Sequence, residues 1–326
     1  MKKRTKILIS LLVVVLLFVI FDIASYEIAN RKFLIDFIPK EQWASYKFPA
    51  WWENKFRMHD VTTMYWFERN GAEKLFRDPE GLEYKSSPVW IFGCSFVYGT
   101  SMINGNHRNE DTFGHILSHK IHHPVYTRGY PSWGVQHMYY QLEKGDIFNQ
   151  IPTPEYVIYV FISDHARRMQ KLIYDFWSDG AYLRYKEENG KLVQMKPILE
   201  PLWKFNAVKI YLTNLEYNVR MDVSNRDKNF DLLKKYLISS NEILQNHNPN
   251  VKFIVLKYDG GDGYDSWFLE TERWKELENK GIIVVDANKE LGVKLEEKEF
   301  LDEDNYHPNP HAWTKISDML AKKYIK

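Results

Sequence analysis

Apolar and polar positions along the chain group into blocks that predict strands followed by helices from residue 88 onward. Five short apolar runs are typical of buried strands in a parallel sheet, which carry apolar residues on both faces: Val89–Gly93, Val125–Arg128, Tyr156–Ile162, Lys252–Tyr258 and Ile282–Asp286. Between or after them, apolar residues recur at helical spacing over Glu110–Ile121, Gln136–Leu142, Phe230–Gln245, Trp267–Glu278 and Trp313–Ile325. This alternation predicts an α/β fold, a three-layer α/β/α sandwich with a five-stranded parallel sheet.

One hairpin signal interrupts the alternation. Tyr182–Lys186 and Lys191–Met195 flank the dipeptide Asn189-Gly190, which favours a type I′ turn between two antiparallel strands. We expect a surface insertion near residues 178–205. Loops carried on a rigid scaffold often serve binding, so this insertion would wall a cleft and tune substrate choice.

The N-terminus has the pattern of an export signal. Lys2, Lys3, Arg4 and Lys6 precede an apolar run from Ile7 to Phe21, and such a positive flank stays in the cytoplasm. No small-residue cleavage site follows, so we expect an uncleaved signal anchor, a transmembrane helix over residues 1–27. The rest of the chain would then be extracytoplasmic on the cell membrane. Cleavage and secretion form the alternative.

Residues 28–87 show no clear period and are rich in aromatic side chains. We expect this lead-in to pack on the main domain, residues 88–326. Stacking on sugar rings or contact with the membrane interface are the alternatives, because tryptophan and tyrosine favour both settings.

Charge and cysteine content exclude several classes of protein. The chain has 326 residues, with 44 Lys and Arg against 43 Asp and Glu. Without the four N-terminal charges the balance is 40 against 43, or −3, which argues against nucleic acid as a partner. The single cysteine, Cys94, rules out an internal disulfide and a multi-cysteine metal site. The sequence does not indicate an oligomeric state.

Polar residues follow each predicted strand. Because the carboxyl ends of parallel strands share one edge of a sheet, we expect these residues to meet there: Ser95, Ser132, Ser163-Asp164, Asp259 and Asp304-x-x-His307. A serine needs an adjacent base to act as a nucleophile, and an imidazole oriented by an anion can supply it. Backbone N–H groups after Gly93 and in the Gly129–Gly134 turn would hold the oxyanion.

Two of these motifs resemble the first and last blocks of the SGNH (GDSL-type) hydrolase superfamily, in its membrane-anchored bacterial type. They are Gly93-Cys94-Ser95-Phe96-x-x-Gly99 and Asp304-x-x-His307-Pro308-Asn309. The resemblance implies an SGNH, flavodoxin-like fold without a cofactor, in which Ser95 is the nucleophile, His307 the base and Asp304 its orienter.

The family's middle blocks match less well. The resemblance places the second-block glycine, a backbone donor to the oxyanion, at Ser132, with Gly134 as the competing alignment. The third-block asparagine falls on Ser163, whose hydroxyl can donate from a shorter side chain. The oxyanion hole would therefore comprise Ser95, Ser132 or Gly134, and Ser163.

Other chemistry fits less well. His115 and His119 are four residues apart, but the glutamate of a His-Glu-x-x-His zinc motif is missing. The glycine-rich loop after Asp259 lacks the spacing of a calcium-binding EF-hand. Cys94 as nucleophile is disfavoured, because a residue between Gly93 and Ser95 at a strand end packs inward.

Three functions remain open at this stage. The leading one is an extracytoplasmic serine esterase that removes acetyl or another small acyl group from an envelope glycan or related carbohydrate. An O-acyltransferase to a glycan would use the same residues. The third is a catalytically weak binding or assembly protein in which Ser163 marks a decayed oxyanion hole.

Overall fold

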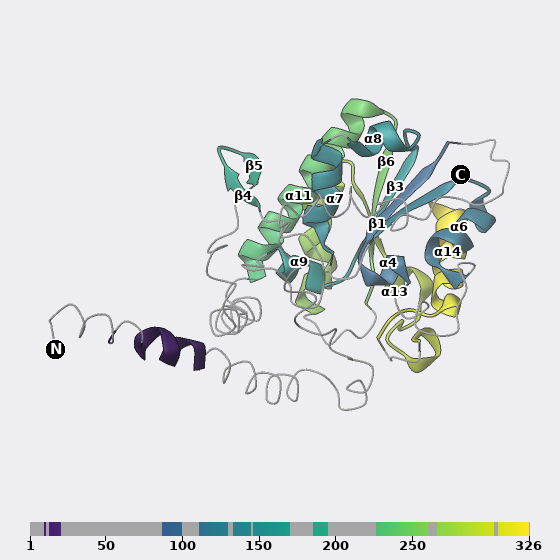
Figure 1. The fold of residues 1–326 in the computed structure, drawn as a ribbon. Helices are drawn as coiled ribbons and strands as arrows, with labels where there is room; N and C mark the ends of the chain where they lie inside the picture. Colours follow the sequence, from purple (N-terminus) through teal and green to yellow (C-terminus); the bar gives the residue numbers. More distant parts are fainter. Residues whose placement is uncertain are drawn as a thin grey trace.

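In a computed structural model, the protein is built around a parallel sheet (Figure 1). The structure describes residues 10, 13–20, 87–99, 111–129, 133–144, 146–169, 185–194, 226–259, 266–302 and 306–325. Within these residues the sheet has five parallel strands in the order β2-β1-β3-β6-β7. The strands are β1 (Val89–Gly93), β2 (Val125–Gly129), β3 (Tyr156–Phe161), β6 (Lys252–Lys257) and β7 (Ile283–Asp286). This is the flavodoxin-like order, so the predicted five-stranded α/β fold is confirmed.

Helices cover both faces of the sheet (Figure 1). One face carries α7 (Val135–Lys144) and α11 (Arg226–His247), and the other carries α6 (Phe113–Ile121) and α14 (Pro310–Lys323). Successive side chains of a strand point to opposite faces. Trp90 and Phe92 of β1 therefore enter the core under α7 and α11, while Val89 and Ile91 enter the core under α6 and α14.

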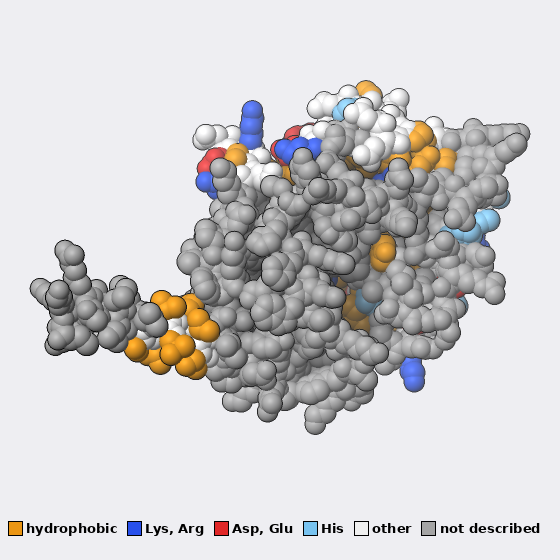
Figure 2. Space-filling view, in the orientation of Figure 1, with side chains coloured by type: hydrophobic (Ala, Val, Ile, Leu, Met, Phe, Trp, Pro, Cys, Tyr) orange, Lys and Arg blue, Asp and Glu red, His pale blue; other side chains and the backbone are white. Residues whose placement is uncertain are grey.

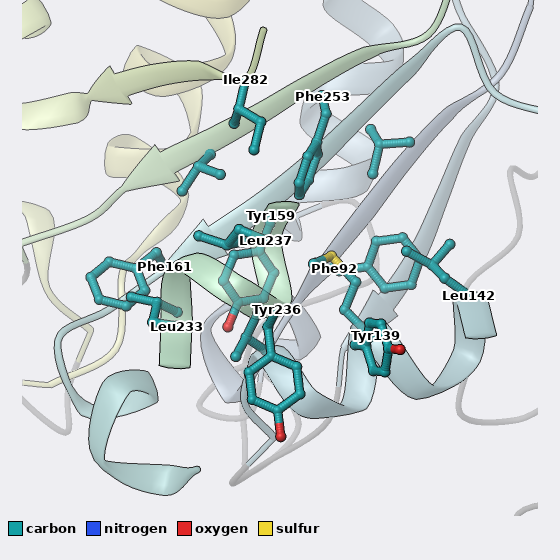
Figure 3. Close-up of a cluster of buried hydrophobic side chains, with 14 of the residues drawn as sticks. Phe92, Tyr139, Leu142, Tyr159, Phe161, Leu233, Tyr236, Leu237, Phe253 and Ile282 are labelled. Carbon is teal, nitrogen blue, oxygen red and sulfur yellow. The ribbon is translucent and has the colours of Figure 1, made fainter. Parts of the chain in front are cut away.

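The core under α7 and α11 is dense in aromatic rings (Figure 3). Phe92 and Phe253 from the sheet lie among side chains of the two helices, including Tyr139 and Tyr236, whose ring centroids are 5.6 Å apart. Aromatic side chains bury large areas and dominate the energetics of a core. This packing fixes α7, and with it Trp133 and Gly134, which directly precede α7.

The predicted helix over 267–278 is confirmed only in its last turn. The chain forms two 3₁₀ turns, η5 (Ser266–Leu269) and η6 (Thr271–Trp274), and then one turn of α-helix, α12 (Lys275–Glu278). Side chains donate hydrogen bonds to two carbonyls that would accept backbone N–H groups in a continuous helix. The Trp274 indole donates to the Phe268 carbonyl at 2.9 Å, and the buried Lys257 ammonium donates to the Leu269 carbonyl at 2.6 Å.

Several short elements were not predicted. They are α4 (Ser95–Tyr98), α8 (Asp146–Gln150), α9 (Asp164–Arg168), α13 (Ala287–Leu291) and η7 (Lys298–Phe300). The last helix, α14, begins three residues before its predicted start, because Pro310 occupies the first turn and the Asn309 side chain accepts the Ala312 N–H at 3.1 Å.

The predicted hairpin is confirmed as β4 (Tyr185–Glu188) and β5 (Lys191–Gln194). Asn189 and Gly190 have φ of 52° and 78°, as a type I′ turn requires. The Tyr185 hydroxyl donates to the Glu143 carboxylate of α7 at 3.1 Å, which docks the hairpin on the main domain. Burial, reinforced by Glu143, raises the pKa of Tyr185 far above its usual range. The rest of the predicted insertion, residues 178–205, lies outside the described residues.

Residues 13–20 are helical, and their apolar side chains are 40–62% exposed (Figure 2). Among the described residues, no helix combines the length and the apolar character needed to cross a membrane. Most of the predicted anchor, residues 1–27, and nearly all of the lead-in, residues 28–87, lie outside the described part of the chain. The anchor and the packing of the lead-in stay predictions.

Candidate active site

Ser95 is the first residue of α4, a single helical turn that begins directly after β1. Two glycines make this tight turn possible. A Cβ on Gly93 would collide with the Val97 side chain, and one on Gly129 would lie 3.1 Å from the Cys94 carbonyl oxygen. Gly99, with φ of 75°, closes the turn by donating its N–H to the Ser95 carbonyl at 2.8 Å. The chain therefore folds sharply back over the ends of β1 and β2.

The side chains of this turn take different directions. Cys94 is fully buried in the core under α6 and α14, so the prediction that it packs inward is confirmed. Ser95 is 7% exposed. The ring of Phe96, the next residue, is also buried and meets residues from the far end of the chain.

His307 lies against this turn. Its ring centroid is 5.1 Å from that of Phe96 and 4.9 Å from that of Tyr306. Backbone contacts hold the base of its loop, since the Asp302 N–H donates to the His307 carbonyl at 2.8 Å and Leu301 forms a β-bridge with Pro308. Phe96 and His307, from motifs more than two hundred residues apart in sequence, are thus in contact.

Phe96 also joins the end of β6 to this place, because its ring lies 5.5 Å from the ring of Tyr258, which directly precedes Asp259. The structure therefore brings the Ser95 turn, His307 and the end of β6 together at the carboxyl edge of the sheet. Asp304 and Ser132 lie outside the described residues, so their predicted roles stay predictions, as does direct contact between Ser95 and His307.

The backbone of Gly134 is engaged within the protein. Its N–H donates to Nδ1 of His137 at 3.1 Å, and the carbonyl on the other side of the same peptide, that of Trp133, accepts from Nη1 of Arg168 at 2.7 Å. An N–H that serves an imidazole is turned away from an incoming ligand. The Gly134 N–H thus already has a partner within the protein, and the oxyanion roles of Ser132 and Gly134 stay predictions.

Ser163 follows β3 and is 2% exposed, and its carbonyl accepts the Ala166 N–H at 3.2 Å, in the first turn of α9. Asp164 and Arg168 of α9 form a buried ion pair, with Oδ2 and Nε 2.5 Å apart. Sequence reasoning missed Arg168. The available signal was the spacing of four residues between an aspartate and an arginine, which places them on one helix face.

His165, the residue after Asp164, is fully buried. Its Nδ1 is 2.7 Å from the Tyr159 hydroxyl. Burial and then the Arg168 guanidinium hold the pKa of His165 well below its usual value, against the opposing effect of Asp164. Burial, followed by the nearby Cys94 thiol, raises the pKa of Tyr159 well above its usual value. This pair is neutral at physiological pH.

The histidine pair on α6 lies elsewhere. The rings of His115 and His119 have centroids 4.4 Å apart. Within the part of the chain that the structure describes, three or more His, Cys, Asp or Glu side chains nowhere gather as a metal site would require.

Comparison with known proteins gives matches among solved structures alone, since no family model and no curated protein matches the chain. The lipase Lip_vut3 from a goat rumen metagenome has a TM-score of 0.44 and 14% identity over 74% of this chain and 98% of its own. A member of the lipolytic protein G-D-S-L family from Veillonella parvula has a TM-score of 0.40 and 12% identity over 73% and 98%. The acetyl xylan esterase Est2A from Butyrivibrio proteoclasticus has a TM-score of 0.42 and 12% identity over 74% and 64%. Solved proteins similar to this chain thus include the G-D-S-L type that its sequence motifs resemble.

Proposed function

We propose that this protein is a carboxylic ester hydrolase with Ser95 as its nucleophile. The observation that carries the proposal is the contact of the His307 ring with Phe96, one residue after Ser95, at the carboxyl edge of a parallel sheet. Ligands of open α/β folds bind at this edge. A hydroxyl and an imidazole that enter it from distant parts of the chain are the groups that acyl transfer needs.

In the proposed reaction, Oγ of Ser95 attacks the ester carbonyl carbon while His307 takes the hydroxyl proton. The tetrahedral intermediate collapses, the bond to the leaving oxygen breaks, and His307 returns the proton to the departing alcohol. Water then attacks the acyl carbon while His307 takes its proton. The bond to Oγ of Ser95 breaks, His307 returns the proton to Oγ, and the acid is released. Asp304, three residues before His307, would hold the imidazole in the tautomer that accepts the proton.

The oxyanion of the intermediate needs donors placed in advance. We assign this role to the backbone N–H groups of Ser95 and Ser132 and to the hydroxyl of Ser163. These residues follow β1, β2 and β3, which are neighbours in the sheet. The engagement of the Gly134 N–H by His137 supports the choice of Ser132 as the second donor.

The proposed substrate is a carbohydrate that carries acetyl or another small acyl group, outside the cytoplasm. Three observations support this choice: the basic and apolar N-terminus, the 7% exposure of Ser95, and the acetyl xylan esterase among similar solved proteins. A nucleophile so enclosed suits a small acyl group better than a long chain. The predicted signal anchor would hold the enzyme on the outer face of the membrane.

Hydrolysis of an aryl acetate by the full chain and by Ser95→Ala tests the proposal. We expect Ser95→Ala to lower kcat by about 10⁴-fold or more, because loss of a nucleophile leaves catalysis to the remaining site alone. Ser118→Ala is the matched control. Ser118 is a buried serine of α6, where it donates to the His115 carbonyl at 2.8 Å, and its loss should leave kcat within about twofold. Equal rates for wild type and Ser95→Ala would refute the assignment.

A further inference from the structure

Beside the proposed oxyanion hole lies a buried cation that the reaction above does not use. Arg168 of α9 is 7% exposed. Its Nε donates to Oδ2 of Asp164 at 2.5 Å, and its Nη1 donates to the Trp133 carbonyl at 2.7 Å. One planar guanidinium thus connects the segment after β3 with the segment after β2.

These two segments carry two of the proposed oxyanion donors. Trp133 directly follows Ser132, and Asp164 directly follows Ser163. Because the guanidinium fork is rigid, the distance between its two acceptors is set by covalent geometry. The two hydrogen bonds of the guanidinium, to Asp164 and to the Trp133 carbonyl, therefore constrain how far Trp133 and Asp164 lie apart.

The peptide between Trp133 and Gly134 is held at both ends. The carbonyl oxygen and the N–H of a trans peptide point in opposite directions. Here the carbonyl accepts from Arg168 while the N–H donates to Nδ1 of His137 at 3.1 Å. Rotation of this peptide plane would break both hydrogen bonds, so the peptide from Trp133 to Gly134 is held in one orientation.

Close packing removes the remaining freedom. A Cβ on Gly134 would lie 2.6 Å from Oε1 of Gln136 and 3.4 Å from Cβ of Arg168. The Gln136 side chain in turn donates to the Arg168 carbonyl at 3.3 Å. Trp133 and Gly134 are thereby held between α7 and α9.

We infer that Arg168 is a positioning residue, which sets the spacing and orientation of the two segments that carry Ser132 and Ser163. This inference rests on the proposed function. Catalysis by an oxyanion hole depends on donors placed within a few tenths of an ångström, and a misplacement of about 1 Å costs about 10²-fold in rate. A residue that touches neither substrate nor nucleophile can therefore control kcat.

Arg168→Lys is the decisive variant. Lysine keeps the positive charge for Asp164 but presents a point charge in place of the rigid fork. We expect kcat for an aryl acetate to fall about 10- to 100-fold, with KM within about twofold.

The chain offers a matched control in Lys257→Gln. Lys257 is also a buried cation at a strand end, 2.9 Å from the Asp286 carboxylate and 2.6 Å from the Leu269 carbonyl. This variant should lower the midpoint of thermal unfolding at least as much as Arg168→Lys, yet keep kcat within about twofold. If the two variants lose kcat in proportion to stability, Arg168 has only a structural role.

A double variant with Ser163 gives a comparison of kcat values that a change in stability does not affect. If Arg168 acts through the oxyanion hole, the losses of kcat in Arg168→Lys and Ser163→Ala are not independent, and the double variant loses clearly less than their product. Should Arg168→Lys fail to fold, Arg168→Met combined with Asp164→Asn removes both buried charges and gives the same comparison.

The outcomes distinguish failure of the positioning role of Arg168 from failure of the proposed ester hydrolase function. A folded Arg168→Lys with wild-type kcat, or losses that multiply with those of Ser163→Ala, overturns the positioning role and leaves Ser95 as nucleophile. A wild-type protein that neither hydrolyses aryl esters nor reacts with a fluorophosphonate overturns the proposed function, and the role of Arg168 with it.

Discussion

At the scale of single residues, Ser163 is the position where this chain departs most from the family that it resembles. A serine hydroxyl donates from a shorter side chain than an asparagine amide. We predict that Ser163→Asn keeps or raises kcat, while Ser163→Ala lowers it by about 10²-fold through loss of a donor. Steady-state hydrolysis of an aryl acetate measures both. Because Ser163 is 2% exposed, thermal unfolding is recorded alongside. A folded but inactive Ser163→Asn would refute this placement of the oxyanion hole.

The lowered pKa of His165 predicts how the stability of the protein depends on pH. Its pKa in the folded protein lies well below the usual value, chiefly through burial. In the unfolded chain it takes up a proton near pH ~6.5. Below that pH His165 binds a proton in the unfolded state but not in the folded state, so the free energy of unfolding decreases as the pH falls. Above that pH His165 is neutral in both states and does not change the free energy of unfolding. The slope for one such group approaches about 1.4 kcal/mol per pH unit.

Denaturant unfolding between about pH 7.5 and pH 5.5 measures this slope, a range in which histidine is the side chain that titrates. We expect a clearly flatter dependence in His165→Gln than in wild type. Identical slopes in the two proteins would show that His165 is not held neutral.

Sequence reasoning found residues whose chemistry shows in a local pattern. Ser95 and His307 stand in short motifs, Ser95 directly after β1 and His307 between η7 and α14, and the structure brings their segments together. Arg168 and His137 were not found in this way, and the spacing of Asp164 and Arg168 indicated only an ion pair. Their roles come from hydrogen bonds to the segment at Trp133 and Gly134, and those bonds exist only after α7 and α9 have packed on the sheet.

At the scale of elements, the turn from β1 into α4 depends on the absence of a side chain at Gly93. A Cβ there would collide with the Val97 side chain, so we predict that Gly93→Ala destabilises the protein by about 1–3 kcal/mol and lowers kcat by displacing Ser95. Val97→Ala in the same chain removes the nearest colliding atom, Cγ2. The double variant should therefore be more stable than the sum of the single losses predicts. Strict additivity in denaturant unfolding would contradict this reading of the turn.

The strands were predictable and several helices were not, for a physical reason. Buried parallel strands are continuous apolar runs, and all five predicted runs form strands. Single-turn elements such as α4, α9 and α13 are too short to show a helical period. The segment from Ser266 to Glu278 has that period, but it forms two 3₁₀ turns before one α-helical turn, and its Phe268 and Leu269 carbonyls accept from the Trp274 indole and the Lys257 ammonium.

At the scale of the whole molecule, the N-terminus predicts where the protein resides. We expect the full chain, expressed in a bacterium, to sediment with membranes and to resist extraction by high salt, because an apolar segment held by lipid does not depend on charge. A variant that lacks residues 2–27 should be soluble after expression and keep its kcat. A full chain found free in solution at its full mass would contradict the anchor, and one shortened at the N-terminus would favour cleavage.

The fold brings together two segments that are distant in sequence, the turn at Ser95 and the loop at His307. Phe96 of α4, Tyr258 after β6 and the His307 ring come together because the strands are parallel and end at the same edge. The order of the strands puts the end of β1 between those of β2 and β3, so Ser95 stands between the two proposed sources of oxyanion donors. This arrangement links the topology of the sheet to the proposed chemistry.

Labelling with a fluorophosphonate, followed by mass-spectrometric mapping of the modified residue, tests the central claim most directly. We predict a single adduct on Ser95, formed by the wild type and by Ser118→Ala, and formed at least about 10²-fold more slowly by His307→Ala, because serine without its base is a poor nucleophile. An adduct on another residue, or labelling of Ser95 at the same rate without the His307 imidazole, would contradict the account.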